Sequence, residues 1–262
     1  MFSVTTAQLY AWLAAFLWPF ARILAIITTE PLLGNRSVPV TVKIGFALFV
    51  TLIVAPLLGP MPNVQPGSAA GLLILGQQVL IGLAIGFSMR IVYSAVEMAG
   101  HLAGLQMGLG FATFFDPQNS TQIAVIAQFL GLLAILLFLA SNGHLMVVMA
   151  LADSFHTLPI NGQLFSSHAW PALVAWGGEI FRMGLLLSLP LATAMLTANL
   201  SLGIMTRAAP QLNIFTVGFP VTIAGGFLVL LLSLSYMAPQ IVQVLQQGVG
   251  MMLKIPELAH AP

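Results

Sequence analysis

Charged side chains are nearly absent from this sequence. Lys, Arg, Asp and Glu together make up 5% of its 262 residues, whereas an ordinary soluble domain carries about 25%. Seven cationic and six anionic side chains cannot hydrate the surface of a folded chain of this length. Most of that surface must therefore face lipid or other protein. The net charge of +1 gives no basis for binding nucleic acid, which requires clustered Lys and Arg to neutralise phosphates.

Cysteine is absent, which excludes disulfide bonds and thiolate chemistry. The sequence also lacks the GxSxG, Walker A, dinucleotide-binding and HExxH patterns that mark common catalytic sites. Its five histidines do not have the spacing of metal ligands. These absences argue against an enzyme and against a bound metal or other cofactor.

Long apolar runs fill the chain instead. Six segments are readable, and each contains a stretch near the ~20 residues with which a helix spans a bilayer. They are residues 7–29, 39–58, 69–104, 122–150, 172–208 and 212–246. The runs are too long for strands and do not alternate in polarity. The sequence therefore predicts an all-α protein of long hydrophobic helices that Pro and Gly kink or connect.

Several charged side chains interrupt these runs, although a charge at the bilayer centre costs about 2.5–3.5 kcal/mol. They are Arg22, Arg90, Glu97, Glu179 and Arg182. We expect them to face protein or to lie near helix ends, with Glu179 and Arg182 forming a local ion pair of small energetic worth. These helices therefore require neighbours.

Two rows of glycine support close helix packing. Gly82 and Gly86 stand four residues apart, and Gly100, Gly104 and Gly108 repeat that spacing twice. Such rows remove side chains from one helix face and allow another backbone to approach closely.

Glu97 and His101 form a possible polar pair, because residues four apart on a helix share a face. In a proton-coupled transporter such a pair could relay protons. The alternative, which we favour, is a polar pair at a subunit contact.

The segment from Gly104 to Thr121, GLQMGLGFATFFDPQNST, combines apolar and loop-forming residues. Gly108 and Gly110 allow the chain to leave the helix, and Pro117 disfavours helix at the residue before it. Three phenylalanines lie between these positions. Non-helical backbone at membrane depth must be buried in protein or line a cavity, so the sequence predicts either a Phe-bearing plug or an ordinary packed connection.

These residues carry a resemblance to a known family. The matching runs are LLGNRSVPVTVKIGFAL (32–48), GLQMGLGFATFFDP (104–117), SNGHL (141–145), FHTLPI (155–160) and LSLGIMTRAAPQLNIFTVGFP (200–220). Together they resemble the FliR-like subunits of the type III export-gate family, in its flagellar branch. None of the runs is a reaction motif.

The resemblance implies an architecture and partners. FliR-like subunits assemble with several copies of FliP and FliQ into a helical, closed export gate, and they also contact FlhB. A FliP-like part over 1–205 would precede a FliQ-like helical hairpin over 206–254, followed by a loose tail over 255–262. The chain would reside in the bacterial inner membrane, in the flagellar basal body, where it contacts lipid.

The resemblance also implies roles for the loop residues. The plug loop of the family maps onto residues 106–122, with Met107, Phe111, Phe114 and Phe115 as seal residues. We therefore expect a gate subunit that conducts unfolded flagellar proteins. A stand-alone proton-coupled transporter is the alternative, and a membrane-bound enzyme is the least favoured because no catalytic constellation is present.

Overall fold

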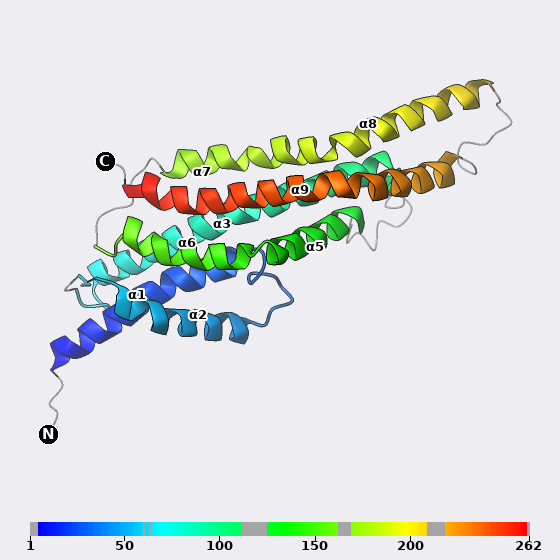
Figure 1. The fold of residues 1–262 in the computed structure, drawn as a ribbon. Coiled ribbons are helices and arrows are strands. Elements are labelled where there is room, and N and C mark those ends of the chain that lie inside the picture. Colours follow the sequence, from blue (N-terminus) through cyan, green and yellow to red (C-terminus); the bar gives the residue numbers. More distant parts are fainter. Residues whose placement is uncertain are drawn as a thin grey trace. The chain divides into compact units, whose positions relative to one another are not determined.

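A computed structural model of the chain describes residues 5–59, 61, 62, 64–111, 125–161, 169–208 and 218–260 (Figure 1). Within these ranges every regular element is a helix and none is a strand. The predicted all-α fold of long apolar helices is therefore confirmed.

The helices have the following bounds. They are α1 (Thr6–Thr29), α2 (Val40–Val54), the 3₁₀ turn η1 (Ala55–Leu57), α3 (Ala69–Gln106), the 3₁₀ turn η2 (Leu109–Phe111), α5 (Val125–Ala140), α6 (Gly143–Thr157), α7 (Ala169–Gly177), α8 (Glu179–Ala208) and α9 (Phe219–His260). Each of the six apolar segments predicted from the sequence overlaps at least one of them.

The segment predicted as one run over 122–150 is broken in the structure. α5 ends at Ala140 and α6 begins at Gly143. Asn142 between them has a φ of 57°, in the left-handed region that Asn tolerates better than most residues. The Asn142-Gly143 dipeptide is a turn signal that hydropathy alone conceals.

Two predictions for the C-terminal part are wrong. The helical hairpin expected within 206–254 is not there, because a single helix, α9, occupies residues 219–254. The structure has two helices there, α8 and α9, which run in opposite directions on either side of residues 209–218 (Figure 1). The expected loose tail also fails up to His260, since α9 continues to that residue and buries Ile255 and Ala259.

Five stretches of helix in the described ranges are long and apolar enough to cross a membrane. They are Gln8–Thr29, Val40–Leu57, Ala69–Gln106, Ala169–Ala208 and Phe219–Ala259, and the broken pair α5 and α6 raises the number to six. Within Val40–Leu57 only 17% of the residues are buried. The apolar 18-residue windows of Ala169–Ala208 and Phe219–Ala259 are each only 22% buried. Large apolar faces therefore remain exposed on this chain.

α1 has defined ends. Thr5 and Gln8 form a capping box, in which the Thr5 hydroxyl accepts from the Gln8 N–H and the Gln8 side chain accepts from the Thr5 N–H. At the other end, Glu30 Oε2 accepts from the N–H groups of Leu32 and Leu33, at 3.0 and 2.9 Å. Burial raises the pKa of the Glu30 carboxyl, and these two hydrogen bonds oppose the rise. The chain is thereby turned tightly after α1.

The chain forms two compact units. Unit 1 comprises Met1–Ile91, Asn142–Gly177 and Gln246–Pro262, and unit 2 comprises Val92–Ser141 and Gly178–Leu245. α3 passes from one to the other, so its first half belongs to unit 1 and its second half to unit 2.

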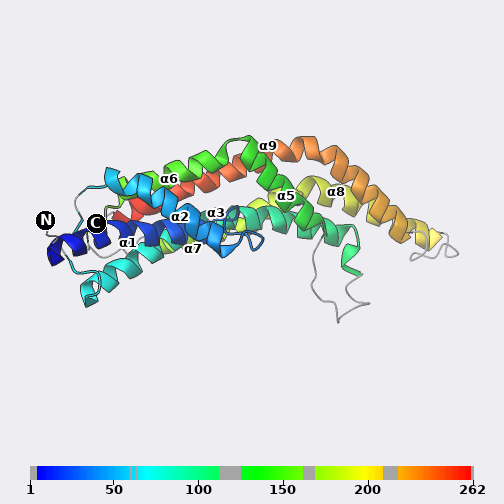
Figure 2. The ribbon, with the colours of Figure 1, turned by 90° about the horizontal axis from the view of Figure 1, so that it is seen from below.

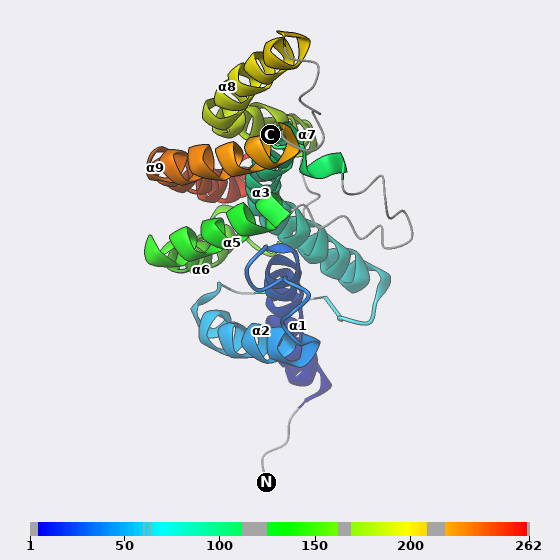
Figure 3. The ribbon, with the colours of Figure 1, turned by 90° about the vertical axis from the view of Figure 1, so that its right-hand side faces the viewer.

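In unit 1, α1 lies beside α2 (Figures 2 and 3) and packs directly on α3 through glycine. A Cβ at Gly82 would collide with the carbonyl oxygen of Arg22 and would lie 2.7 Å from the Cβ of Ala25. A Cβ at Gly86 would lie 2.8 Å from the carbonyl oxygen of Ile26. The two helix backbones touch at these positions because no side chain separates them.

Arg22 forms the polar centre of unit 1 and is 0% exposed. Its Nε donates to Gln78 Oε1 on α3 at 2.8 Å, and its Nη1 donates to the carbonyl oxygen of Ser154 on α6 at 2.7 Å. Its Nη2 donates to the carbonyl oxygen of Leu158, just beyond α6, at 2.9 Å. The guanidinium also lies 4.4 Å from the ring centroid of Phe155.

No carboxylate in the described ranges forms an ion pair with Arg22. Its charge is instead stabilised by carbonyl groups at the C-terminal end of α6, where the helix dipole is negative, and by an aromatic face. The expectation that Arg22 faces protein is confirmed, and one side chain links α1, α3 and α6.

Unit 2 is built around the second half of α3. A Cβ at Gly100 would collide with Ala127 of α5, whose amide nitrogen would be 2.7 Å away. A Cβ at Gly184 of α8 would lie 3.0 Å from the carbonyl oxygen of Ala95 and 3.1 Å from the Cβ of Met98. α3 is therefore in close contact with α5 and with α8.

Replacing Arg22 with Met should destabilise the protein by roughly 3 kcal/mol, because buried acceptors on Gln78 and Ser154 and a half-buried one on Leu158 lose their donor. The measurement is the thermal unfolding midpoint of the protein in its own membranes, read by limited proteolysis at rising temperature. Arg182→Met is the matched control, since the Arg182 side chain is 58% exposed and bonds only to nearby Glu179. Equal midpoints for the two variants would contradict the role of Arg22.

Replacing Gly82 with Ala should cost roughly 1–3 kcal/mol, since the added methyl group forces the backbones of α1 and α3 apart. Gly76→Ala on the same helix is the control, because a Cβ there meets nothing within 4 Å. That substitution should be neutral or slightly stabilising. The same unfolding measurement compares them, and a Gly82 variant as stable as the Gly76 variant would refute the contact.

Candidate functional site

The end of α3 carries the residues that the sequence predicts as a loop hinge. The N–H of Gly108 donates to the carbonyl oxygen of Leu105 at 3.0 Å, and Gly108 has a φ of 80°. Glycine in this left-handed conformation is a common helix terminator, because it carries no Cβ to collide with the backbone. The 3₁₀ turn Leu109–Phe111, which contains Gly110, follows directly.

Met107 lies immediately before this exit and is 0% exposed. Its side chain packs on Gly226 of α9. The residue before it, Gln106, receives a hydrogen bond on its carbonyl oxygen from Asn199 of α8. The first residues of the predicted plug loop are therefore held within unit 2.

The remaining predicted loop residues lie largely outside the described ranges. Phe114, Phe115 and Pro117 fall within 112–124, which the structure does not describe, and only the backbone of Phe111 is placed, in η2. The assignment of the phenylalanines as seal residues stays a prediction.

The structure does not join Glu97 to His101. Both side chains are exposed, and no hydrogen bond or ion pair connects them to each other or to another residue in the described part of the chain. The Glu97 side chain lies over Gly131 of α5, where a Cβ would be 3.7 Å from Glu97 Oε1. These polar groups therefore remain available to a group outside this chain.

The predicted packing glycines differ in how tightly they are covered. Gly82 and Gly86 face α1, and Gly100 faces α5, at distances that leave no room for a side chain. Gly104 is looser, since the nearest atom to a Cβ there is Cγ1 of Ile126 at 4.0 Å. The predicted ion pair is present, because Arg182 Nε donates to Glu179 Oε2 in the first turn of α8.

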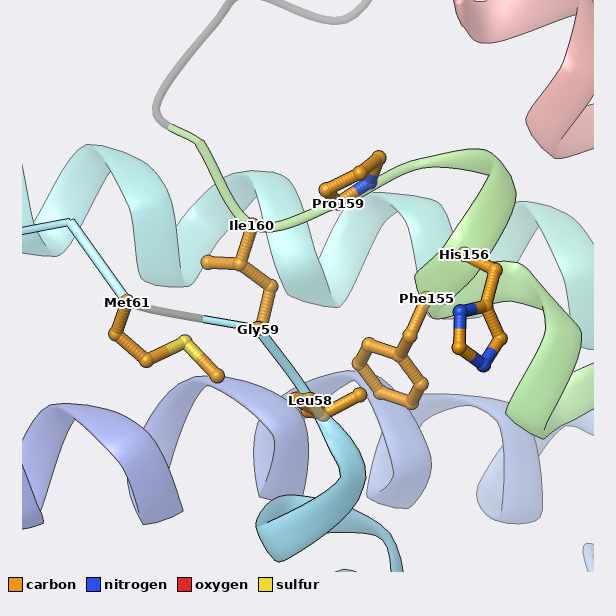
Figure 4. Close-up of a pocket in the computed structure, with 7 residues that line it drawn as sticks. All are labelled: Leu58, Gly59, Met61, Phe155, His156, Pro159 and Ile160. Atoms are coloured by element: carbon orange, nitrogen blue, oxygen red, sulfur yellow. The ribbon is translucent and has the colours of Figure 1, made fainter.

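Unit 1 contains a small pocket of about 70 Å³ between the end of α2 and the end of α6. Its lining residues are Leu58, Gly59, Met61, Phe155, His156, Pro159 and Ile160. Figure 4 shows the Phe155 ring lying next to Leu58. The volume suits roughly two water molecules and is far below the ~300 Å³ or more of a typical ligand pocket.

Among the described residues, no group of three or more His, Asp or Glu side chains could hold a metal ion. What unit 2 offers is a helix end, a glycine exit and a buried attachment to two neighbouring helices. Such a site can position a segment of chain.

The comparisons with known proteins agree with this description. Residues 13–248 match the model of the family described as bacterial export proteins, family 1. This chain belongs to that family. It is 48% identical over 239 residues to the flagellar biosynthetic protein FliR of Pectobacterium carotovorum subsp. carotovorum, with 91% of each chain covered. It is 46% identical to FliR of Escherichia coli strain K12 over the same shares, and 32% identical to FliR of Bacillus subtilis strain 168 over 84% of this chain and 86% of that one.

The resemblance seen in the sequence is thereby confirmed. A member of this export family with long apolar helices is a membrane component of flagellar protein export. Sequence reasoning did not anticipate the Arg22 centre or the attachment of Met107 to α9. The signals were a lone Arg within an apolar run and the Gly225-Gly226 pair, neither of which reveals its partner in sequence.

Replacing Glu97 with Gln should change stability by less than about 0.5 kcal/mol, because this exposed carboxylate bonds to nothing in the described chain. Swimming in soft agar should persist in cells that carry the variant, with at most an assembly defect. Glu30→Ala is the positive control, since it removes a buried acceptor of two backbone N–H groups and should cost about 1–3 kcal/mol. Loss of a coupled uptake activity in the Glu97 variant would indicate a transporter instead.

Proposed function

We propose that this chain is a subunit of the flagellar type III protein export gate in the bacterial inner membrane, at the flagellar basal body. It forms, together with several copies of FliP and FliQ, the closed channel through which unfolded flagellar proteins are exported. It also contacts FlhB and membrane lipid. In this proposal the loop over residues 106–122 helps to plug the channel.

The observation that carries the proposal is the exposed apolar surface of a chain that belongs to an export family. The most apolar windows of Ala169–Ala208 and Phe219–Ala259 are only 22% buried, and exposed residues include Leu196, Leu200 and Leu231. Such faces are stable only against lipid or against helices of similar character. A multi-subunit helical gate supplies that cover.

The end of α3 supports the position of the plug. The chain leaves the helix at Gly108 through a left-handed glycine and begins the loop from a buried attachment in unit 2. Met107, Phe111, Phe114 and Phe115 are the seal residues in this proposal. Large aromatic side chains exclude water well because each covers 150–250 Å² of surface.

The proposal assigns no reaction and no cofactor to the chain. The motive force for export comes from other components, because the sequence has no nucleotide-binding pattern. Nucleic acid is not a partner, given the net charge of +1.

A stand-alone proton-coupled transporter is the alternative. It required Glu97 and His101 to act as a relay, and these side chains do not bond to each other in the structure. It also required broken helices in both halves of an inverted repeat. The gate accounts for the exposed apolar faces without either requirement.

Deleting residues Gly110 to Asp116 tests the plug. We expect cells carrying the deletion to leak ions and small molecules, because the aromatic side chains that exclude water are removed while the helices remain. The measurement is uptake of a membrane-impermeant dye, together with export of a flagellar substrate into the medium.

A pair of triple variants controls for loop length. Changing Phe111, Phe114 and Phe115 to Ala should leak, whereas changing them to Leu should leak less, since Leu retains most of the apolar bulk. An intact permeability barrier together with normal export in the deletion strain would contradict the assignment of residues 106–122 as a plug.

A further inference from the structure

The carbonyl group at the end of α3 is bonded from a neighbouring helix. Asn199 of α8 donates from Nδ2 to the carbonyl oxygen of Gln106 at 3.2 Å. The last carbonyls of a helix have no partner within the helix itself, and a side chain that satisfies one of them fixes the helix end. The final residue of α3 is thus attached to α8.

The next residue is attached to α9. Met107 is fully buried, and a Cβ at Gly226 would lie 2.9 Å from its Cε, 3.1 Å from its Sδ and closer still to its Cγ. The whole methionine side chain therefore rests on bare backbone of α9. Methionine suits such a notch because it is unbranched and has three rotatable bonds.

The glycine at 226 is required by this contact, whereas its neighbour is not. A Cβ at Gly225 meets nothing within 4 Å, so that position tolerates a methyl group. At Gly226 a methyl group would come too close to Cγ, Sδ and Cε of Met107, so the Met107 side chain would have to move. Adjacent glycines on one helix thus provide a matched pair.

The chain turns out of the helix directly after these two attachments, at Gly108. A shift of Gln106 or Met107 would therefore be transmitted to the direction in which the following segment starts. We propose that Asn199, Met107 and Gly226 are positioning residues, which together form a loop anchor. The loop anchor fixes the start of the segment that begins at Gly108 to α8 and α9. Its effect on permeability rests on the proposed function.

A cysteine pair tests the geometry without reference to export. The chain contains no cysteine, so Met107→Cys with Gly226→Cys introduces the only thiols. The Cγ atom of Met107 lies within 2.9 Å of the Cβ position at Gly226. This Cγ is one bond, roughly 1.5 Å, from the Cβ of Met107. The Cβ positions of residues 107 and 226 therefore lie within about 4.4 Å of each other. A disulfide requires about 3.5–4.5 Å between Cβ atoms.

We expect this pair to form an intramolecular disulfide in membranes on mild oxidation, read as protection from a maleimide-polyethylene glycol mass tag. The pair Met107→Cys with Gly225→Cys should form it at least about tenfold more slowly, because no atom of Met107 lies within 4 Å of a Cβ at Gly225. Equal rates for the two pairs would overturn the loop anchor.

Single substitutions test the consequence in cells. Gly226→Ala should raise dye uptake about tenfold over the Gly225→Ala control, which corresponds to about 1.4 kcal/mol in a two-state equilibrium. Met107→Ala combined with Gly226→Ala should leak no more than either single variant, because both changes break the same contact. Additive effects would contradict a shared role.

Two further comparisons decide the positioning role if one variant fails to accumulate in the membrane. Asn199→Ala removes one attachment without adding an atom, so it should also leak if Gly226→Ala fails to accumulate. Normal permeability in an Asn199 or Gly226 variant that accumulates normally would overturn the positioning role, even if the disulfide forms. If deletion of residues 110–116 causes no leak, the proposed plug fails, whereas the cysteine result still decides the geometry of the loop anchor.

Discussion

Close backbone contact between helices is the interaction on which the described structure depends. With few charged side chains, these helices are held together mainly by packing, and packing is strongest where no side chain separates two backbones. Gly82 and Gly86 bring α1 onto α3 in unit 1, and Gly100 brings α5 onto α3 in unit 2. α3 is the common partner within each unit, which is why a chain with so few charged side chains retains definite helix neighbours.

The scarcity of charged side chains also explains how the charged and polar side chains of this protein find partners. Arg22 is not balanced by a carboxylate in the described ranges but by carbonyl oxygens at the end of α6, Gln78 and an aromatic ring. Glu97 and His101, in contrast, are exposed and unbonded in the part of the chain that the structure describes. Buried polar groups thus bind helices of this chain together, whereas the exposed ones remain for a neighbouring molecule.

Much of this could be predicted from the sequence, for identifiable reasons. Hydrophobic runs near the bilayer length revealed the long helices, and rows of glycine marked helix faces because a missing side chain is visible in sequence. The break at Asn142 was missed because hydropathy is continuous across it, and α9 was misjudged because the hairpin and tail were taken from the resemblance, whereas this helix runs unbroken from Phe219 to His260. The contact of Met107 with Gly226 could not be predicted, since the sequence does not show which helices become neighbours.

The central claim is that the apolar faces of α2, α8 and α9 are covered by partner subunits. Co-expression of this chain with its cognate FliP and FliQ, followed by affinity purification in mild detergent, tests it directly. The account predicts a stable mixed complex, together with poor yield and aggregation of this chain when it is expressed alone. A monodisperse, stable chain that purifies by itself and captures neither partner would contradict it.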